Sequence, residues 1–85
     1  MKLSKTEYYS KVEKKFFKKH KDLINKYAQI LKELSIDPFD NSLKTHKLKG
    51  NLSEYHEYRI VMVIKIVEDK IILVNIGTHD DVYGK

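Results

Sequence analysis

The sequence predicts an α+β fold in which an N-terminal helical hairpin packs on a small twisted antiparallel β-sheet. Two observations predict it: apolar residues recur at helical spacing in the first part of the chain, and β-branched residues follow one another from Tyr55 onward. Helices that come first and paired strands that come later are typical of α+β domains. A chain of 85 residues has room for one small core, so we expect a single domain over residues 1–85.

The first half of the chain is predicted to hold two helices. Ser4 and Glu7 have the spacing of a capping box at the start of the first helix. Its apolar face consists of Tyr9, Val12 and Phe16. Asp22 is the predicted N-cap of the second helix, which should end near Ser35 because Pro38 disfavours helical backbone before it. Its apolar stripe consists of Leu23, Tyr27, Ile30, Leu31 and Leu34.

The second half is predicted to form strands. Residues 58–67 and 71–76 are rich in β-branched side chains and are separated by a polar turn at residues 68–70, a pattern that indicates a β-hairpin. Residues 1–5 are expected to form a short edge strand that leads into the first helix.

Composition excludes several classes of protein. The chain has no cysteine, so disulfides and thiolate metal sites are excluded, and a reducing cytoplasm is the expected location. The histidines lie too far apart for a zinc motif, and we expect no metal and no small-molecule cofactor. No apolar run is long enough to span a membrane, and no signal peptide is expected.

Positive charge is concentrated in the first half of the chain. Residues 1–50 contain thirteen lysines and six acids, a net charge of +7, whereas residues 51–85 contain four Lys or Arg and six acids, a net charge of −2. A basic half is expected of a protein that meets phosphate or an acidic partner. A solvated, lysine-rich helical surface is the alternative interpretation.

Three stretches of the chain, in this order, resemble the RelE/ParE superfamily of toxins, and its YafQ-like branch most. They are the loop from Asp37-Pro38-Phe39 to Gly50, the strand start Tyr58-Arg59-Ile60-Val61, and the strand exit at residues 76–83. The resemblance implies a toxin of a type II toxin–antitoxin system that cuts mRNA in the ribosomal A site without a metal. Its implied partners are a cognate antitoxin, the ribosome and mRNA.

In such enzymes the 2′-OH of the substrate attacks the adjacent phosphate, with a protein base, a protein acid and stabilising cations. The resemblance implies that His79 and His46 share the acid and base roles, and that Arg59 and Lys49 stabilise the phosphorane. It also implies that Tyr83 orients a base or phosphate. The predicted RNA-binding residues are Lys44, Lys47, Lys49, Lys14, Lys15 and Lys18.

Each candidate also has a structural explanation. An imidazole can both donate and accept a proton, so His79 suits proton transfer, but a turn histidine beside Asp80 or Asp81 would look the same. His46 lies among lysines, which suits a neutral base but also a solvated loop residue. Arg59 needs an anionic partner, either substrate phosphate or a carboxylate such as Glu57, Glu68 or a terminal Asp.

The chain departs from its relatives at two places. Only residues 51–57 are available where relatives have a full strand and turn, so one strand of the sheet is expected to be shortened or missing. Asn75 stands where YafQ-like members have an Arg, and His56 is a candidate for a histidine that the shorter segment lacks. Two alternatives therefore stay open, a ParE-like poison of DNA gyrase and an inactive member that only binds antitoxin or RNA.

Overall fold

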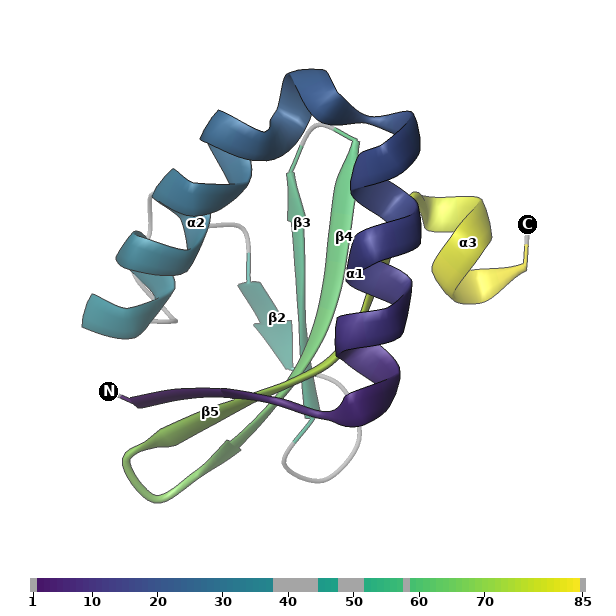
Figure 1. The fold of residues 1–85 in the computed structure, drawn as a ribbon. Coiled ribbons are helices and arrows are strands. Elements are labelled where there is room, and N and C mark those ends of the chain that lie inside the picture. The colour runs from purple at the N-terminus through teal and green to yellow at the C-terminus, as the bar shows by residue number, and fades with distance from the viewer. Residues whose placement is uncertain (1, 38–44, 48–51, 58, 85) are drawn as a thin grey trace.

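The computed structural model describes residues 2–37, 45–47, 52–57 and 59–84, with the side chains of residues 45–47 and 57 outside the description. In chain order the elements are β1 (Lys2–Lys5), α1 (Glu7–Lys19), the 3₁₀ turn η1 (Lys21–Leu23), α2 (Ile24–Ile36), β2 (Thr45–Lys47), β3 (Leu52–Glu57), β4 (Ile60–Val67), β5 (Lys70–Gly77) and α3 (His79–Tyr83). Helices α1 and α2 cover one face of the sheet, and the short α3 follows the end of β5 (Figure 1). The predicted α+β class and helical hairpin are confirmed.

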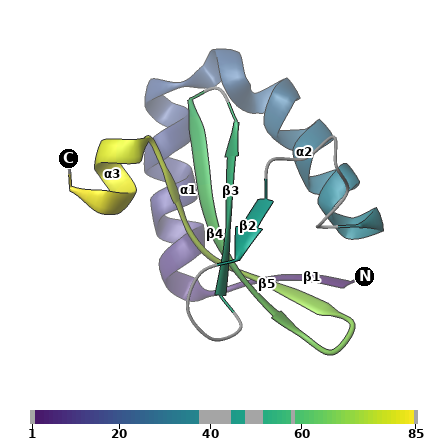
Figure 2. The same ribbon diagram turned by 180° about the vertical axis from the view of Figure 1, so that it is seen from behind.

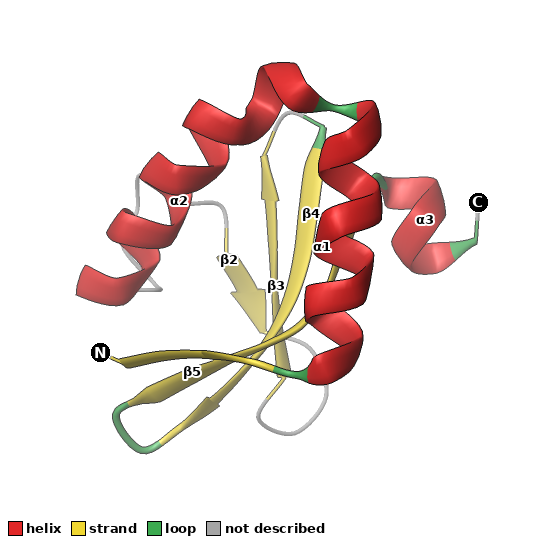
Figure 3. Ribbon diagram, in the orientation of Figure 1, coloured by secondary structure: helices red, strands yellow, loops and turns green. Residues whose placement is uncertain are grey.

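The sheet has five strands in the order β1-β5-β4-β3-β2 (Figure 3). The alternative of a missing strand is wrong, because residues 52–57 form β3 and pair with β4 along six residues. The sheet is also mixed and not wholly antiparallel, since β1 runs parallel to β5. Parallel neighbours need a long crossover connection, and here the helices and the other strands lie between them in sequence.

Both helix starts differ from the prediction. Thr6, and not Ser4, caps α1, because its hydroxyl accepts a hydrogen bond from the Tyr9 backbone N–H at 3.0 Å. Ser4 instead pairs with Ile72 inside the sheet. Asp22 does not cap α2 with its side chain, since it lies in the 3₁₀ turn that precedes that helix. The end of α2 at Ile36 agrees with the predicted end near Ser35.

The core lies between the helices and the sheet. Its buried members from the helical layer are Tyr9, Phe16, Leu23, Tyr27, Ile30 and Leu34. Its members from the sheet are Tyr55, Ile60, Met62, Ile64, Ile71, Leu73 and Ile76. Six of the apolar residues in the predicted helical stripes are buried members of this cluster. The other two, Val12 and Leu31, are partly buried and pack against it, as expected for amphipathic helices on a sheet.

The opposite face of the sheet is left open by α1 and α2 (Figure 2). In β3 the buried Tyr55 points into the core, so its neighbours Glu54 and His56 project from the open face. His56 pairs with Val61 of β4, which pairs in turn with Gly77 at the end of β5. This register places His56 beside the point where the chain leaves the sheet and enters α3.

Candidate functional site

Helix α3 begins directly after the sheet and is fixed by its own cap. The Thr78 hydroxyl accepts from the Asp81 N–H at 3.2 Å, and the Asp81 carboxylate accepts from the Thr78 N–H at 3.0 Å. This reciprocal pair is a capping box. Gly77 allows the close approach, because a Cβ there would lie 2.5 Å from the Cβ of Asp81.

His79 and Tyr83 are four residues apart on α3 and so share one face of the helix. Their ring centroids lie 5.0 Å apart, and the His79 ring lies 6.1 Å from that of His56. The structure therefore brings together two predicted site residues, His79 and Tyr83, and a second imidazole, that of His56 in β3. The sequence offered His56 only as a possible substitute, and the strand register is what places it beside His79.

Glu54 is a site residue that sequence reasoning missed. Its carboxylate accepts a hydrogen bond from the Tyr83 hydroxyl, and it lies 4.0 Å from Nδ1 of His56. Desolvation, the hydrogen bond to Glu54 and the negative charge of that carboxylate raise the pKa of Tyr83 to about 12. Tyr83 therefore keeps its proton at neutral pH and can donate a hydrogen bond.

His46 lies in β2, where its backbone pairs with Glu54 of β3. The His46 backbone therefore lies in the strand next to β3, the strand that carries Glu54 and His56. The side chains of His46 and Lys47 are outside the described part of the structure, and so are residues Lys44 and Lys49. Their predicted roles stay predictions.

Arg59 lies in the turn between β3 and β4 and not within a strand. Its guanidinium forms an ion pair with Asp22 of η1 at 2.5 Å, and its side chain is 48% exposed. The sequence did not suggest Asp22 as the anionic partner, because the two residues are 37 positions apart. The ion pair joins the β3–β4 turn to the helical layer near the end of the sheet that leads into α3.

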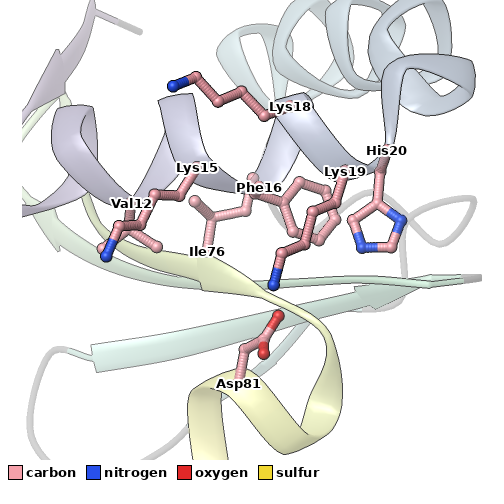
Figure 4. Close-up of a pocket in the computed structure, with 8 residues that line it drawn as sticks. All are labelled: Val12, Lys15, Phe16, Lys18, Lys19, His20, Ile76 and Asp81. Carbon is pink, nitrogen blue, oxygen red and sulfur yellow. The ribbon is translucent and has the colours of Figure 1, made fainter.

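A cleft of about 500 Å³ lies between α1 and α3 (Figure 4). Of the predicted RNA-binding lysines of α1, Lys15 and Lys18 line it, whereas Lys14 is exposed outside the lining. The other residues that line the cleft are Val12, Phe16, Lys19, His20, Ile76 and Asp81. The cleft thus has an apolar floor and a rim rich in positive charge.

The described part of the chain contains no group of three or more His, Cys, Asp or Glu residues able to hold a metal ion. Among the same residues, no helix is long and apolar enough to cross a membrane. What the site does offer is two imidazoles, a phenol and a carboxylate within contact of one another. Each of these groups can donate or accept a hydrogen bond, and imidazole is the side chain that proteins use most often for proton transfer.

Three solved structures share this fold at low sequence identity. YafQ from Escherichia coli strain BL21(DE3) is 23% identical with a TM-score of 0.79, over 96% of this chain and 97% of that one. A metal-bound toxin from Helicobacter pylori is 24% identical with a TM-score of 0.76, over 98% and 99% of the two chains. A chain of the DinJ–YafQ toxin–antitoxin complex of E. coli is 26% identical with a TM-score of 0.73, over 96% of each chain.

No curated protein matches the chain at a significant level. The family model for YafQ, described as a bacterial toxin of a type II toxin–antitoxin system, matches residues 1–84. That range covers almost the whole chain, and the predicted resemblance to YafQ-like toxins is confirmed. The chain therefore belongs to the YafQ family of type II toxins.

Proposed function

We propose that this toxin is a ribosome-dependent mRNA endoribonuclease that inhibits translation. The observation that carries the proposal is the contact of His79 with His56 and Tyr83 at the end of the sheet. Solvent-accessible imidazoles beside a protonated phenol suit proton transfer to and from an RNA chain. A gyrase poison would need no such group, which is why the nuclease is favoured over that alternative.

The proposed reaction is a transesterification within the RNA. A protein base takes the proton of a ribose 2′-OH, and the resulting oxygen attacks the adjacent phosphorus. The bond to the 5′-oxygen breaks, and a protein acid gives that oxygen a proton. The products are a 2′,3′-cyclic phosphate and a 5′-OH, so no metal or redox cofactor is required.

His79 and His46 are the proposed acid and base, with His56 close enough to His79 to assist either proton transfer. Tyr83 would donate a hydrogen bond to a phosphate oxygen or orient a base. Arg59 and Lys49 remain the proposed cations for the phosphorane, and Arg59 would have to exchange its Asp22 partner for phosphate or share it. The lysines of α1 would meet ribosomal RNA or mRNA.

A cognate antitoxin is the proposed protein partner. A solved relative carries an antitoxin in the DinJ–YafQ complex, and the basic first half of this chain suits an acidic segment wrapped around it. The cytoplasm is the proposed location, because ribosomes and mRNA are found there.

The test is to incubate the purified protein with programmed ribosomes and map the new 5′ ends of the mRNA. His79→Gln should reduce the rate of cleavage about a hundredfold or more, as expected when a proton-transfer group is lost. Asp80→Asn, which changes the next residue on α3, an exposed one, is the matched control and should cleave normally.

Intact mRNA with the unaltered protein, in cells whose growth it still arrests, would overturn the nuclease and favour gyrase as the target. Intact mRNA without growth arrest would indicate a member that only binds antitoxin or RNA.

A further inference from the structure

The cleft between α1 and α3 lies across α3 from the His79–Tyr83 pair. Asp81 lines the cleft, and residues two positions apart project from nearly opposite sides of a helix. The helix measures about 10–12 Å across with its side chains, a span of about three nucleotides at ~3.4 Å each. A single RNA chain that reaches His79 can therefore also reach the cleft.

The chemistry of the cleft suits an anion with an apolar neighbour. Lys15, Lys18 and Lys19 are among the residues that line it. The amine of Lys19 is directed toward Asp81, whereas the Lys18 side chain extends on the side of α1 away from Asp81 (Figure 4). Along its floor the Phe16 and His20 rings lie 4.6 Å apart. Phe16 is buried, so the accessible ring of the cleft is that of His20. Lysines beside an accessible ring are the usual components of a site for single-stranded nucleic acid.

Asp81 is the feature of the cleft that does not suit an anion. It is the single carboxylate among the residues that line the cleft in the described part of the chain. The Thr78 backbone N–H holds the pKa of this carboxyl below its usual value, helped by the Thr78 hydroxyl and the positive charge of Lys19 and His20. At neutral pH the cleft therefore contains a fixed negative charge beside its lysines.

We infer that the α1–α3 cleft binds a backbone phosphate of RNA, and that Asp81 competes with this phosphate for the lysines. Asp81 thus limits how tightly RNA is held next to the site. RNA is favoured over an acidic protein segment because the cleft and the His79–Tyr83 pair share one helix, so that one RNA chain can occupy both. The inference rests on the proposed function insofar as RNA is the ligand.

The test uses the intact toxin and a fluorescein-labelled 2′-O-methyl RNA oligonucleotide, which cannot be cleaved because it has no free 2′-OH. Asp81→Asn removes the charge, while its side-chain oxygen can still accept the Thr78 N–H of the capping box. Asp80→Asn makes the same change in net charge on the same helix, outside the cleft lining. Binding is measured by fluorescence anisotropy at several salt concentrations.

We expect Asp81→Asn to lower the Kd about three- to tenfold and Asp80→Asn to change it less than about twofold. Lys19→Gln should weaken binding and reduce the slope of log Kd against log salt by about one, as for the loss of one phosphate contact. Circular dichroism of each variant establishes that it is folded.

Equal effects of the two aspartate variants would overturn the inference, because net charge alone would then explain them. The inference would also be overturned, in favour of an acidic protein segment, if the toxin bound a poly-glutamate peptide more tightly than RNA and Asp81→Asn lowered the Kd for that peptide only. The nuclease proposal fails separately. If Asp81→Asn leaves the Kd for RNA unchanged while the unaltered protein cleaves mRNA on ribosomes, only the inference about the cleft is overturned. If Asp81→Asn lowers the Kd but the unaltered protein does not cleave mRNA, the inference about the cleft is supported and only the nuclease proposal is overturned.

Discussion

At the scale of single residues, the contact between Tyr83 and Glu54 joins the C-terminal helix to β3. Tyr83 is 44% exposed, yet its hydroxyl is directed at a carboxylate 29 positions earlier in the chain. The hydrogen bond exists only while the phenol keeps its proton. Glu54 therefore helps to set both the position of the Tyr83 ring and the pH range over which it can donate.

This pairing predicts an alkaline transition. Because the pKa of Tyr83 is raised to about 12 from 10.0, its contribution to stability is complete below pH 10 and is lost as the pH rises toward 12. In an absorbance titration of the phenols, Tyr83→Phe should remove a transition near pH 12. Glu54→Gln should move that transition to lower pH, because the negative charge is gone. A Tyr83 transition that stays in place in Glu54→Gln would contradict the assignment.

The site was partly predictable from single residues. The resemblance to YafQ-like toxins pointed to His79 and Tyr83, and the structure does bring their rings into contact. Glu54 and His56 depend on strand register, which a short segment with weak alternation does not reveal. The buried Tyr55 between them is the signal that could have shown that both side chains share the open face.

At the scale of elements, α3 is too short to be stable alone. It has five residues, each at least partly exposed, and an isolated helix of that length is unfavourable in water. The capping box and the Tyr83–Glu54 hydrogen bond hold it against the sheet. The position of His79 therefore depends on a few contacts around Gly77.

Gly77→Ala should displace α3 without unfolding the domain. The added Cβ would lie 2.5 Å from the Cβ of Asp81, so the helix start must move. We expect ribosomal cleavage to fall about tenfold or more, since small misplacements of reacting groups reduce rates strongly. Gly84→Ala is the comparison, because its added Cβ meets no atom within 4 Å, although φ of 65° strains it locally. Similar activity in the two variants would contradict the role of the close approach.

The sequence predicted most elements but not their boundaries or partners. Helical periodicity located α1 and α2, because each has one clearly buried face, and runs of β-branched residues located β4 and β5. Ser4 and Thr6 are equally good caps by residue type, and only the parallel pairing of β1 with β5 places Ser4 in the sheet. The few residues available at 51–57 predict a shortened or missing strand, and the structure shows that a strand is present there, since residues 52–57 pair with β4.

At the scale of the whole molecule, a chain of polar contacts connects β1, α1 and α2 through the core. The Lys5 amine forms an ion pair with the Glu13 carboxylate at 2.9 Å, and the same carboxylate accepts a hydrogen bond from the Tyr27 hydroxyl. The Tyr27 and Tyr9 hydroxyls are hydrogen-bonded to each other at 2.7 Å. Tyr9 is fully buried and Tyr27 is 7% exposed. The basic helical layer is thus fixed to the sheet by a satisfied polar network as well as by apolar packing.

Tyr27→Phe should destabilise the whole domain. It leaves the buried Tyr9 hydroxyl without its Tyr27 partner and removes one donor to Glu13, which costs about 1–3 kcal/mol when a buried polar group is left unsatisfied. Urea unfolding should show a lower midpoint with an unchanged slope, because the surface exposed on unfolding is the same.

Tyr8→Phe, in α1 next to Tyr9 and 60% exposed, is the matched control and should stay within about 0.5 kcal/mol of the unaltered protein. Burial also raises the pKa of Tyr27 above its ordinary value, so the contribution of this hydroxyl is complete below pH 10 and is lost at higher pH. Tyr27→Phe and the unaltered protein should therefore differ less in stability above pH 10 than at pH 7. Equal midpoints for Tyr27→Phe and Tyr8→Phe at pH 7 would show that apolar packing alone holds the helices on the sheet.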